Sequence, residues 1–172
     1  MSPYNSYQKQ LDAGAIKPDE LQAHVIKAFE ELYHELNKPI KKRWFFKVKK
    51  SFYGLYIFGK VGRGKTFLMD LFVKSLDGKK VKRQHFHAFM QWIHKSLHRI
   101  KNQQNPIDII IKDLSENINI LCLDEFLVHD ITDAMLLSNI LYALEKYGIS
   151  LVTTSNVAPA DLYYGGLQRK KF

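Results

Sequence analysis

The segment GKVGRGKT, from Gly59 to Thr66, has the residue types and spacing of a phosphate-binding loop. It matches G-x-x-x-x-G-K-[ST] at every position and follows the apolar run GLYIF. Glycines let backbone N–H groups approach phosphate oxygens, Lys65 brings positive charge to the β- and γ-phosphates, and the Thr66 hydroxyl can ligate Mg²⁺. The alternative is an ordinary glycine-rich turn, but the strand expected before the motif and the helix expected after it argue against that. The predicted nucleoside-triphosphate site comprises Gly59, Lys60, Val61, Gly62, Arg63, Gly64, Lys65, Thr66 and Phe67.

A second candidate for chemistry is the acidic pair Asp124 and Glu125, which ends the apolar run of ENINILCLDEF. A nearly unbroken apolar run is typical of a strand buried on both faces. Two carboxylates at the end of such a strand are costly unless a positive partner meets them, and Mg²⁺ with a nucleotide would be such a partner. We therefore interpret LCLDE as a Walker B strand. Asp124 would hold the metal, through water, and Glu125 would act as the general base that polarises the attacking water.

A third candidate is Asn156, which ends the buried strand ISLVTTSN. A polar side chain at the tip of the strand beside Walker B can contact the γ-phosphate or position water, so we interpret Asn156 as a sensor residue. The alternative is a turn-forming asparagine at a strand end.

Alternating strands and helices must position these residues. After an irregular lead-in from Ser2 to Ala15, apolar spacing predicts a helix that opens at Pro18 and continues to Asn37. A strand over 54–58 then leads into the loop and its helix, and a second strand leads into a helix from about Met90 to Lys101. A short helix or strand over 107–114 precedes the Walker B strand. A helix capped near Thr132 and ending at Gly148 comes next, followed by the sensor strand and a new helix near residue 160.

This order predicts an α/β P-loop NTPase in which helices flank a parallel sheet on both faces. A strand between the loop strand and Walker B, with a glutamate after the aspartate, indicates the additional-strand ATPases, of which AAA+ proteins are one branch. We divide the chain into an N-terminal helical segment with a basic linker (1–50) and the P-loop core (51–172).

The composition suits one domain with an N-terminal appendage: 172 residues, 46% of them hydrophobic. A single cysteine, Cys122, excludes an internal disulfide and suits a reducing compartment. We find no apolar run of membrane-spanning length and no signal-peptide core, so a cytoplasmic protein without a transmembrane segment is expected.

The net charge of +9 is concentrated in three basic clusters, residues 38–50, 79–83 and 169–171. Aromatic residues interleave with the first cluster, so it could attract nucleic acid or an acidic protein, although a solvated linker is the simpler interpretation. His94 and His98 share a helix face and could hold a metal, but neither a cysteine nor an HExxH-type glutamate accompanies them, which favours structural histidines.

Taken together, several segments resemble the ZapE family of AFG-type AAA+ ATPases, which occur in bacterial cell division and in mitochondria. They are SPYNSYQKQLDAGAIKPDELQ, GLYIFGKVGRGKTFLMDLF, HFHAFM, LCLDEFLVHDITDAMLL and TTSNVAPADLYYGGLQRKKF, which together cover nearly the whole chain in order. The resemblance implies ATP as the nucleotide, with Lys65 and Thr66 as the Walker A pair. It also implies that Arg169, in GLQR, is an arginine finger that reaches a neighbouring subunit; a surface cation in a basic tail is the alternative.

The resemblance further implies a homo-oligomer when the chain is full length and an ATP-dependent action on the tubulin-like division-ring protein. Members of the family continue past GLQR, whereas this sequence ends at Phe172, so we expect the C-terminal lid to be missing. Two other functions stay open: a nucleotide-switched, helicase-loader-like module that binds nucleic acid, and a fragment that binds ATP without turnover.

Overall fold

The computed structural model describes residues 1–38, 52–100, 103–128 and 130–163. The chain forms two compact units. One contains the helices α1 (Pro3–Asp12), α2 (Glu20–Asn37) and α3 (Lys65–Ser75). The other contains the sheet with the helices α4 (Phe86–Arg99), α5 (Pro106–Asn117) and α6 (Ile131–Tyr147). We call them the helical unit and the sheet unit.

The sheet has four strands: β1 (Gly54–Phe58), β2 (Val81–His85), β3 (Ile120–Asp124) and β4 (Ser150–Ser155). Their order is β1-β4-β3-β2, and every neighbouring pair is parallel. This confirms the predicted parallel sheet of the additional-strand type, because β4 lies between β1, which precedes the glycine-rich loop, and β3, the predicted Walker B strand. All carboxyl ends of the strands therefore meet at one edge, where Phe58 pairs with Ser155 and His85 with Asp124.

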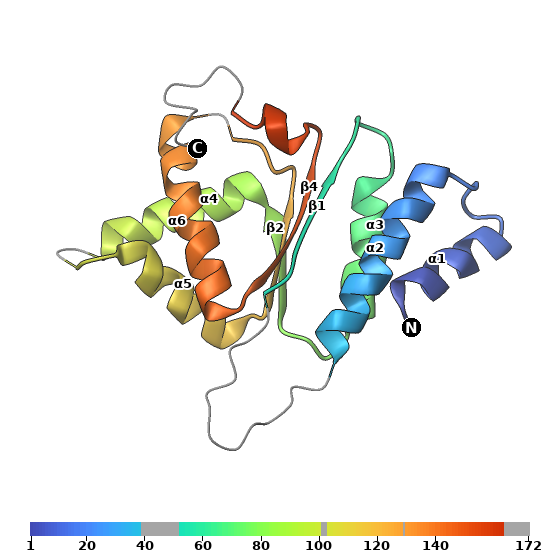
Figure 1. Cartoon of the computed structure of the whole chain (residues 1–172), viewed down its shortest axis with the longest axis horizontal. Coiled ribbons are helices and arrows are strands. Elements are labelled where there is room, and N and C mark those ends of the chain that lie inside the picture. Colours follow the sequence, from blue (N-terminus) through green and yellow to red (C-terminus); the bar gives the residue numbers. More distant parts are fainter. Residues whose placement is uncertain (39–51, 101–102, 129, 164–172) are drawn as a thin grey trace. The chain divides into compact units, whose positions relative to one another are not determined.

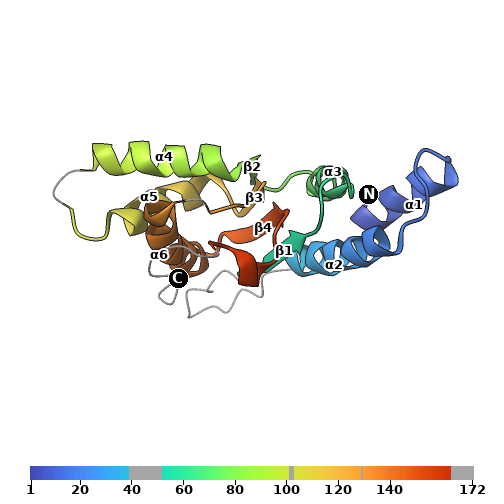
Figure 2. The same cartoon turned by 90° about the horizontal axis from the view of Figure 1, so that it is seen from above.

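Helices α4, α5 and α6 pack together beside the sheet (Figures 1 and 2). Every residue of β3 is buried, as its apolar run predicted. The helix α5 resolves the open choice between helix and strand, since Ile107, Ile110, Ile111 and Leu114 are buried at helical spacing. Helix α4 begins at Phe86, four residues before the predicted start, because Phe86 and Phe89 belong to the same buried face as Met90 and Ile93.

The residues at the two ends of α6 explain where this helix begins and ends. It begins one residue before the predicted cap, since the Asp130 side chain accepts a hydrogen bond of 2.8 Å from the Asp133 N–H. It ends at Gly148, whose φ of 66° is the left-handed conformation that glycine adopts without strain. Beyond β4, the new helix is a single 3₁₀ turn, η1 (Pro159–Asp161).

In the helical unit, α1 replaces the irregular lead-in that the sequence predicted, so that prediction is wrong. Ser2 caps the helix by accepting from the Asn5 N–H, Pro3 occupies its first turn, and Tyr7 is buried. Phe29 of α2 stacks on Phe72 of α3 with ring centroids 4.5 Å apart. No helix within the described residues is long and apolar enough to cross a membrane.

Candidate nucleotide site

The segment Gly59–Thr66, the predicted phosphate loop, begins where β1 ends. The Gly59 N–H donates to the Ser155 carbonyl at 3.2 Å, which continues the pairing of β1 with β4 into the loop. Gly62 and Gly64 have φ angles of 82° and 80°, a region that residues with a Cβ rarely adopt. Gly64 is also the N-cap of α3, so Lys65 and Thr66 lie in the first helical turn, where N–H groups and the helix dipole favour an anion.

The side chains of the loop differ in exposure. Val61 is 80% exposed, and Arg63 and Thr66 are exposed as well. Lys65 is half-buried, and this burial lowers the pKa of its ammonium group. Lys60 is exposed and Phe67 half-buried.

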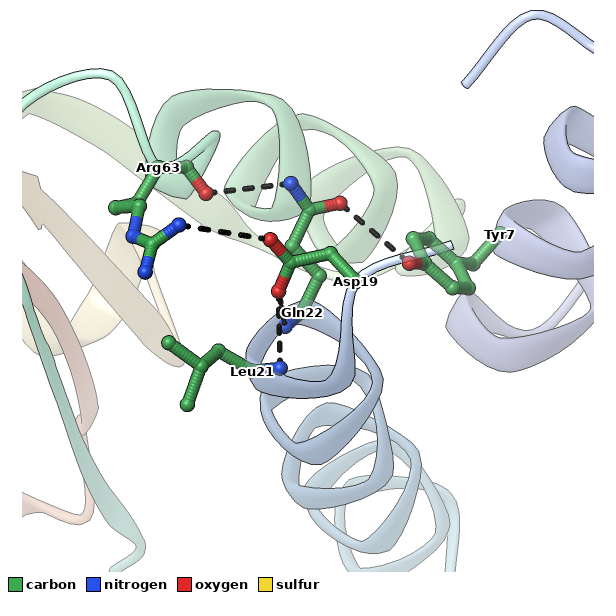
Figure 3. Close-up of polar contacts among 5 residues, drawn as sticks. All are labelled: Tyr7, Asp19, Leu21, Gln22 and Arg63. Carbon is green, nitrogen blue, oxygen red and sulfur yellow. Dashed lines mark hydrogen bonds and ion pairs between the residues drawn. The ribbon is translucent and has the colours of Figure 1, made fainter. Parts of the chain in front are cut away.

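The first turn of α2 contacts the loop inside the helical unit (Figure 3). The Gln22 Nε2 donates to the Arg63 carbonyl at 3.3 Å, and the Asp19 Oδ2 lies 3.8 Å from the Arg63 Nη1. Asp19 also caps α2 by accepting from the N–H groups of Leu21 and Gln22 at 2.9 and 3.0 Å. Gln22 is not among the predicted site residues, because 41 residues separate it from Arg63. The one signal was its presence in the N-terminal segment of the family resemblance.

Asp124 lies at the carboxyl edge of the sheet and is 8% exposed. Its Oδ2 accepts from the Arg83 Nε at 2.7 Å, and its Oδ1 accepts from the Thr154 Oγ1 at 3.1 Å. A buried carboxylate needs a positive partner, and Arg83 of β2 is one. Arg83 and Thr154 were not among the predicted site residues, since their contacts depend on the sheet order.

Glu125 differs sharply from its neighbour. Its side chain is 76% exposed, and its Oε2 lies 3.6 Å from the His85 Nδ1, within ion-pair reach when the imidazole is protonated. Its φ of 55° is a left-handed conformation that costs a residue with a Cβ about 1–2 kcal/mol.

Two residues of β4 hold this turn. The Thr154 Oγ1 accepts from the Glu125 N–H at 3.4 Å, and the Thr154 carbonyl accepts from the Phe126 N–H at 2.7 Å. The Ser155 hydroxyl donates to the Phe126 carbonyl at 2.6 Å. The strained backbone at Glu125 is thus fixed from the neighbouring strand.

Asn156 directly follows β4 and is exposed, between the strand ends that lead to Gly59 and to Asp124. The sheet therefore brings Gly59, Asp124, Glu125 and Asn156 to one edge. Arg169 lies outside the described residues, as does the basic segment 39–51.

The oxygen donors at this edge fit Mg²⁺. A carboxylate has about four acceptor positions, and Asp124 uses two of them for Arg83 and Thr154. Mg²⁺ binds nucleotides with one or two protein oxygens, waters and phosphates, and the free acceptor positions of Asp124 suit that chemistry. Within the described residues there is no group of three or more His, Cys, Asp or Glu side chains that could hold a metal. His94 instead lies 2.8 Å from the Asp133 carboxylate, as a structural histidine would.

Comparison with known proteins assigns the family. The family model described as AFG1-like ATPase matches residues 1–172. The chain belongs to the AFG1-like ATPase family. It is 40% identical over 188 residues to the "Cell division protein ZapE" of Escherichia coli K12, covering 100% of this chain and 50% of that protein. It is 34% identical over 210 residues to the "Uncharacterized protein C115.02c" of Schizosaccharomyces pombe, covering 99% of this chain and 46% of that protein. This member of the AFG1-like family thus spans about half the length of these curated relatives.

Solved structures show the same fold at low identity. DnaA from Aquifex aeolicus bound to AMPPCP superposes with a TM-score of 0.62 at 17% identity, over 90% of this chain and 44% of that one. DnaI superposes with a TM-score of 0.61 at 19% identity, over 92% of this chain and 78% of that one. These likenesses show that this AFG1-like chain has the fold of the P-loop AAA+ proteins.

Proposed function

We propose that this chain binds ATP through the loop Gly59–Thr66 and hydrolyses it with residues at the carboxyl edge of the sheet. The observation that carries the proposal is the strand order β1-β4-β3-β2. It brings together the end of the loop strand, the Asp124–Glu125 pair and Asn156, as a hydrolytic P-loop site requires. Membership of the AFG1-like ATPase family supports the same activity and the choice of adenine.

Each residue has a distinct proposed role. Backbone N–H groups of the loop and the Lys65 ammonium bind the β- and γ-phosphates. Thr66 and Asp124 would hold Mg²⁺, which when bound neutralises charge that develops on the phosphates. Asn156 orients the γ-phosphate or the attacking water.

Glu125 is the proposed general base. Its exposed carboxylate takes a proton from water as the water oxygen attacks the γ-phosphorus, and ADP leaves with the electron pair of the broken P–O bond. We assign Arg169 of a neighbouring subunit to stabilise the transition state, a contribution worth about 10³–10⁵ in rate for arginine fingers. Turnover would then depend on assembly.

The test separates binding from hydrolysis. A fluorescent ATP analogue is titrated into the wild type, Lys65→Ala and Glu125→Gln with and without Mg²⁺, and phosphate release is then measured. Lys65→Ala should bind weakly, whereas Glu125→Gln should bind as the wild type does and turn over about 10²–10⁴-fold more slowly. Lys74→Ala, an exposed lysine of the same helix α3, and Glu116→Gln, an exposed glutamate of α5, are matched controls.

The outcomes distinguish the alternatives. Unchanged turnover in both Lys65→Ala and Glu125→Gln would contradict the mechanism. Binding without turnover by the wild type would restrict this chain to nucleotide binding.

The physiological role we propose is ATP-dependent action in bacterial cell division. The support is the 40% identity with the cell division protein ZapE, of which this chain spans 50%. The proposed partners are further copies of the chain and the tubulin-like division-ring protein. Cosedimentation of the chain with polymers of that protein, with ATP and with ADP, tests the interaction, and equal pelleting with and without polymer would contradict it.

A second candidate is nucleotide-switched binding of single-stranded nucleic acid. The net charge of +9 and the cation-aromatic segment around Lys41, Lys42 and Arg43 favour it. One structure with this fold is the "Replication initiator DnaA bound to AMPPCP and single-stranded DNA". Binding of labelled single-stranded DNA should weaken with salt and on replacing the three cations together; an absence of binding at low salt would remove this candidate.

A further inference from the structure

The phosphate loop contains a peptide with unusual freedom. Gly64 lacks a Cβ and its φ is 80°, and Gly62, on the other side of Arg63, has a φ of 82°. Glycine populates positive and negative φ almost equally, so the Arg63–Gly64 peptide can rotate at little steric cost. A phosphate-binding loop needs one orientation, with N–H groups facing the anion. A contact from outside the loop can select that orientation.

Gln22 contacts this peptide directly. Its Nε2 donates to the Arg63 carbonyl at 3.3 Å (Figure 3). In a trans peptide the C=O and N–H bonds point in opposite directions, so holding the Arg63 carbonyl toward Gln22 holds the Gly64 N–H away from it. We propose that Gln22 is a positioning residue of the phosphate loop, whose amide fixes the Arg63–Gly64 peptide so that the Gly64 N–H faces the phosphates. The inference rests on the proposed function.

Chemistry decides which way the Gln22 amide points. The Arg63 carbonyl can only accept, so it must face the NH₂ group and not the amide oxygen. The Oε1 then faces the Tyr7 hydroxyl at 3.5 Å. Tyr7 is 3% exposed, and burial raises the pKa of its hydroxyl, as the nearby Asp19 charge does to a smaller extent, so the group stays protonated and can donate. Helix α1 thus orients the amide that orients the loop.

Gly64 has a second requirement besides its φ angle. A Cβ at this position would lie 2.9 Å from the Gln22 Nε2, a distance shorter than real contacts allow. At Gly62, by contrast, a Cβ would meet no atom within 4 Å. Gly64 therefore leaves room for the Gln22 amide in the position where it bonds to Arg63, and a Cβ there would push the end of the Gln22 side chain away.

Asp19 fixes the backbone of Gln22. It accepts from the Gln22 N–H at 3.0 Å while its other oxygen faces the Arg63 guanidinium. The Arg63 side chain is 55% exposed, and ion pairs at such exposure contribute little. The contact that positions the loop is accordingly the amide–carbonyl hydrogen bond.

The experiment measures nucleotide affinity with the whole chain at 25 °C. The fluorescent ATP analogue is titrated into the wild type, Lys65→Ala and Gln22→Met, in which methionine keeps the length of the side chain and removes the donor. We expect Gln22→Met to weaken binding about 3- to 10-fold, as the loss of one hydrogen bond predicts. The matched control is Gln8→Met; Gln8 is exposed on α1 and bonds to Asp12 of the same helix at 2.9 Å, so its replacement should leave affinity unchanged.

Competition with inorganic tripolyphosphate identifies where the affinity is lost. If Gln22 positions the loop, Gln22→Met weakens tripolyphosphate and nucleotide by the same factor. A loss for the nucleotide alone would mean that Gln22 contacts the nucleoside, and it would overturn the inference. Gln22→Asn, whose amide is one methylene too short to reach Arg63, should give the same loss and serves if Gln22→Met does not fold.

The two proposals fail differently. Wild-type affinity in both Gln22 variants, with binding lost in Lys65→Ala, would overturn the role of Gln22 and leave the proposed function intact. A wild type that binds neither nucleotide nor tripolyphosphate would overturn both.

Discussion

Two adjacent threonines of β4 provide a matched test of the candidate site. The Thr154 hydroxyl donates to the Asp124 carboxylate at 3.1 Å, whereas the buried Thr153 Oγ1 has no hydrogen-bond partner within the described residues. Both side chains are buried, with exposures of 3% and 2%. Substitution by valine, which replaces the hydroxyl by a methyl and suits a strand, should therefore destabilise the protein at position 154 but not at position 153.

The magnitudes follow from the contacts. A hydrogen bond to a charged group contributes about 1.5–3 kcal/mol, so Thr154→Val should lower the free energy of unfolding by about that amount. A buried hydroxyl without a partner costs about 1–3 kcal/mol, so Thr153→Val should leave stability unchanged or raise it by about 1 kcal/mol.

Labelling of Cys122 with a thiol reagent can measure how often the sheet opens around this site. It is the only cysteine, it is buried in β3, and it reacts with a thiol reagent only when the sheet opens. When closing outpaces labelling, the rate follows the population of the open form. Thr154→Val should therefore label about 10- to 100-fold faster than the wild type, and Thr153→Val should label at the same rate or more slowly. Equal acceleration in both variants would refute the contribution assigned to the Thr154–Asp124 bond.

Two predictions concern titration. Burial raises the pKa of Cys122 to about 12 and outweighs the opposing charge of Arg83. The stability that this thiol contributes is therefore present below its unfolded pKa near 9.0 and is lost as the pH rises toward 12. Cys122→Ser should reduce that loss of stability at alkaline pH in urea titrations, and an identical loss would contradict the assignment. Hydrogen bonds from Lys146 and Tyr147 lower the pKa of Asp108, so its stabilisation is present above the unfolded value near 3.8 and is lost as the pH falls through the lower folded pKa. The difference in free energy of unfolding between the wild type and Asp108→Asn should shrink in acid. The control Asp113→Asn, an exposed position on the same helix, should not show this pH-dependent difference. A difference for Asp108→Asn that stays constant with pH would refute the pairing.

The strands and the loop could be predicted because their signals are local. The glycines, lysine and threonine of GKVGRGKT predict a phosphate-binding loop, and the apolar run before Asp124 predicts a strand buried on both faces. Helix α1 was not predicted because its stability depends on packing against α2 and α3. Its segment contains few large apolar residues, so its sequence shows no clear helical pattern.

The partners of the site residues could not be predicted because they come from distant segments. Arg83 reaches Asp124 only because β2 pairs with β3 in the register that sets His85 beside Asp124. Gln22 reaches the loop only because α2 packs on α3. The sequence predicted candidate groups for chemistry, and the fold shows which groups contact them.

The backbone at Glu125 explains how two consecutive carboxylates come to have different surroundings. Asp124 is 8% exposed and receives hydrogen bonds from Arg83 and Thr154, which hold its carboxylate in one position. The left-handed φ of 55° then ends the strand, and the Glu125 side chain is 76% exposed to solvent. The cost of that φ is offset by the hydrogen bonds from Glu125 and Phe126 to Thr154, so the turn that separates the two carboxylates depends on β4. Loosening this turn by Thr154→Val should therefore reduce turnover more than nucleotide affinity, because the proposed base moves while the phosphate loop does not.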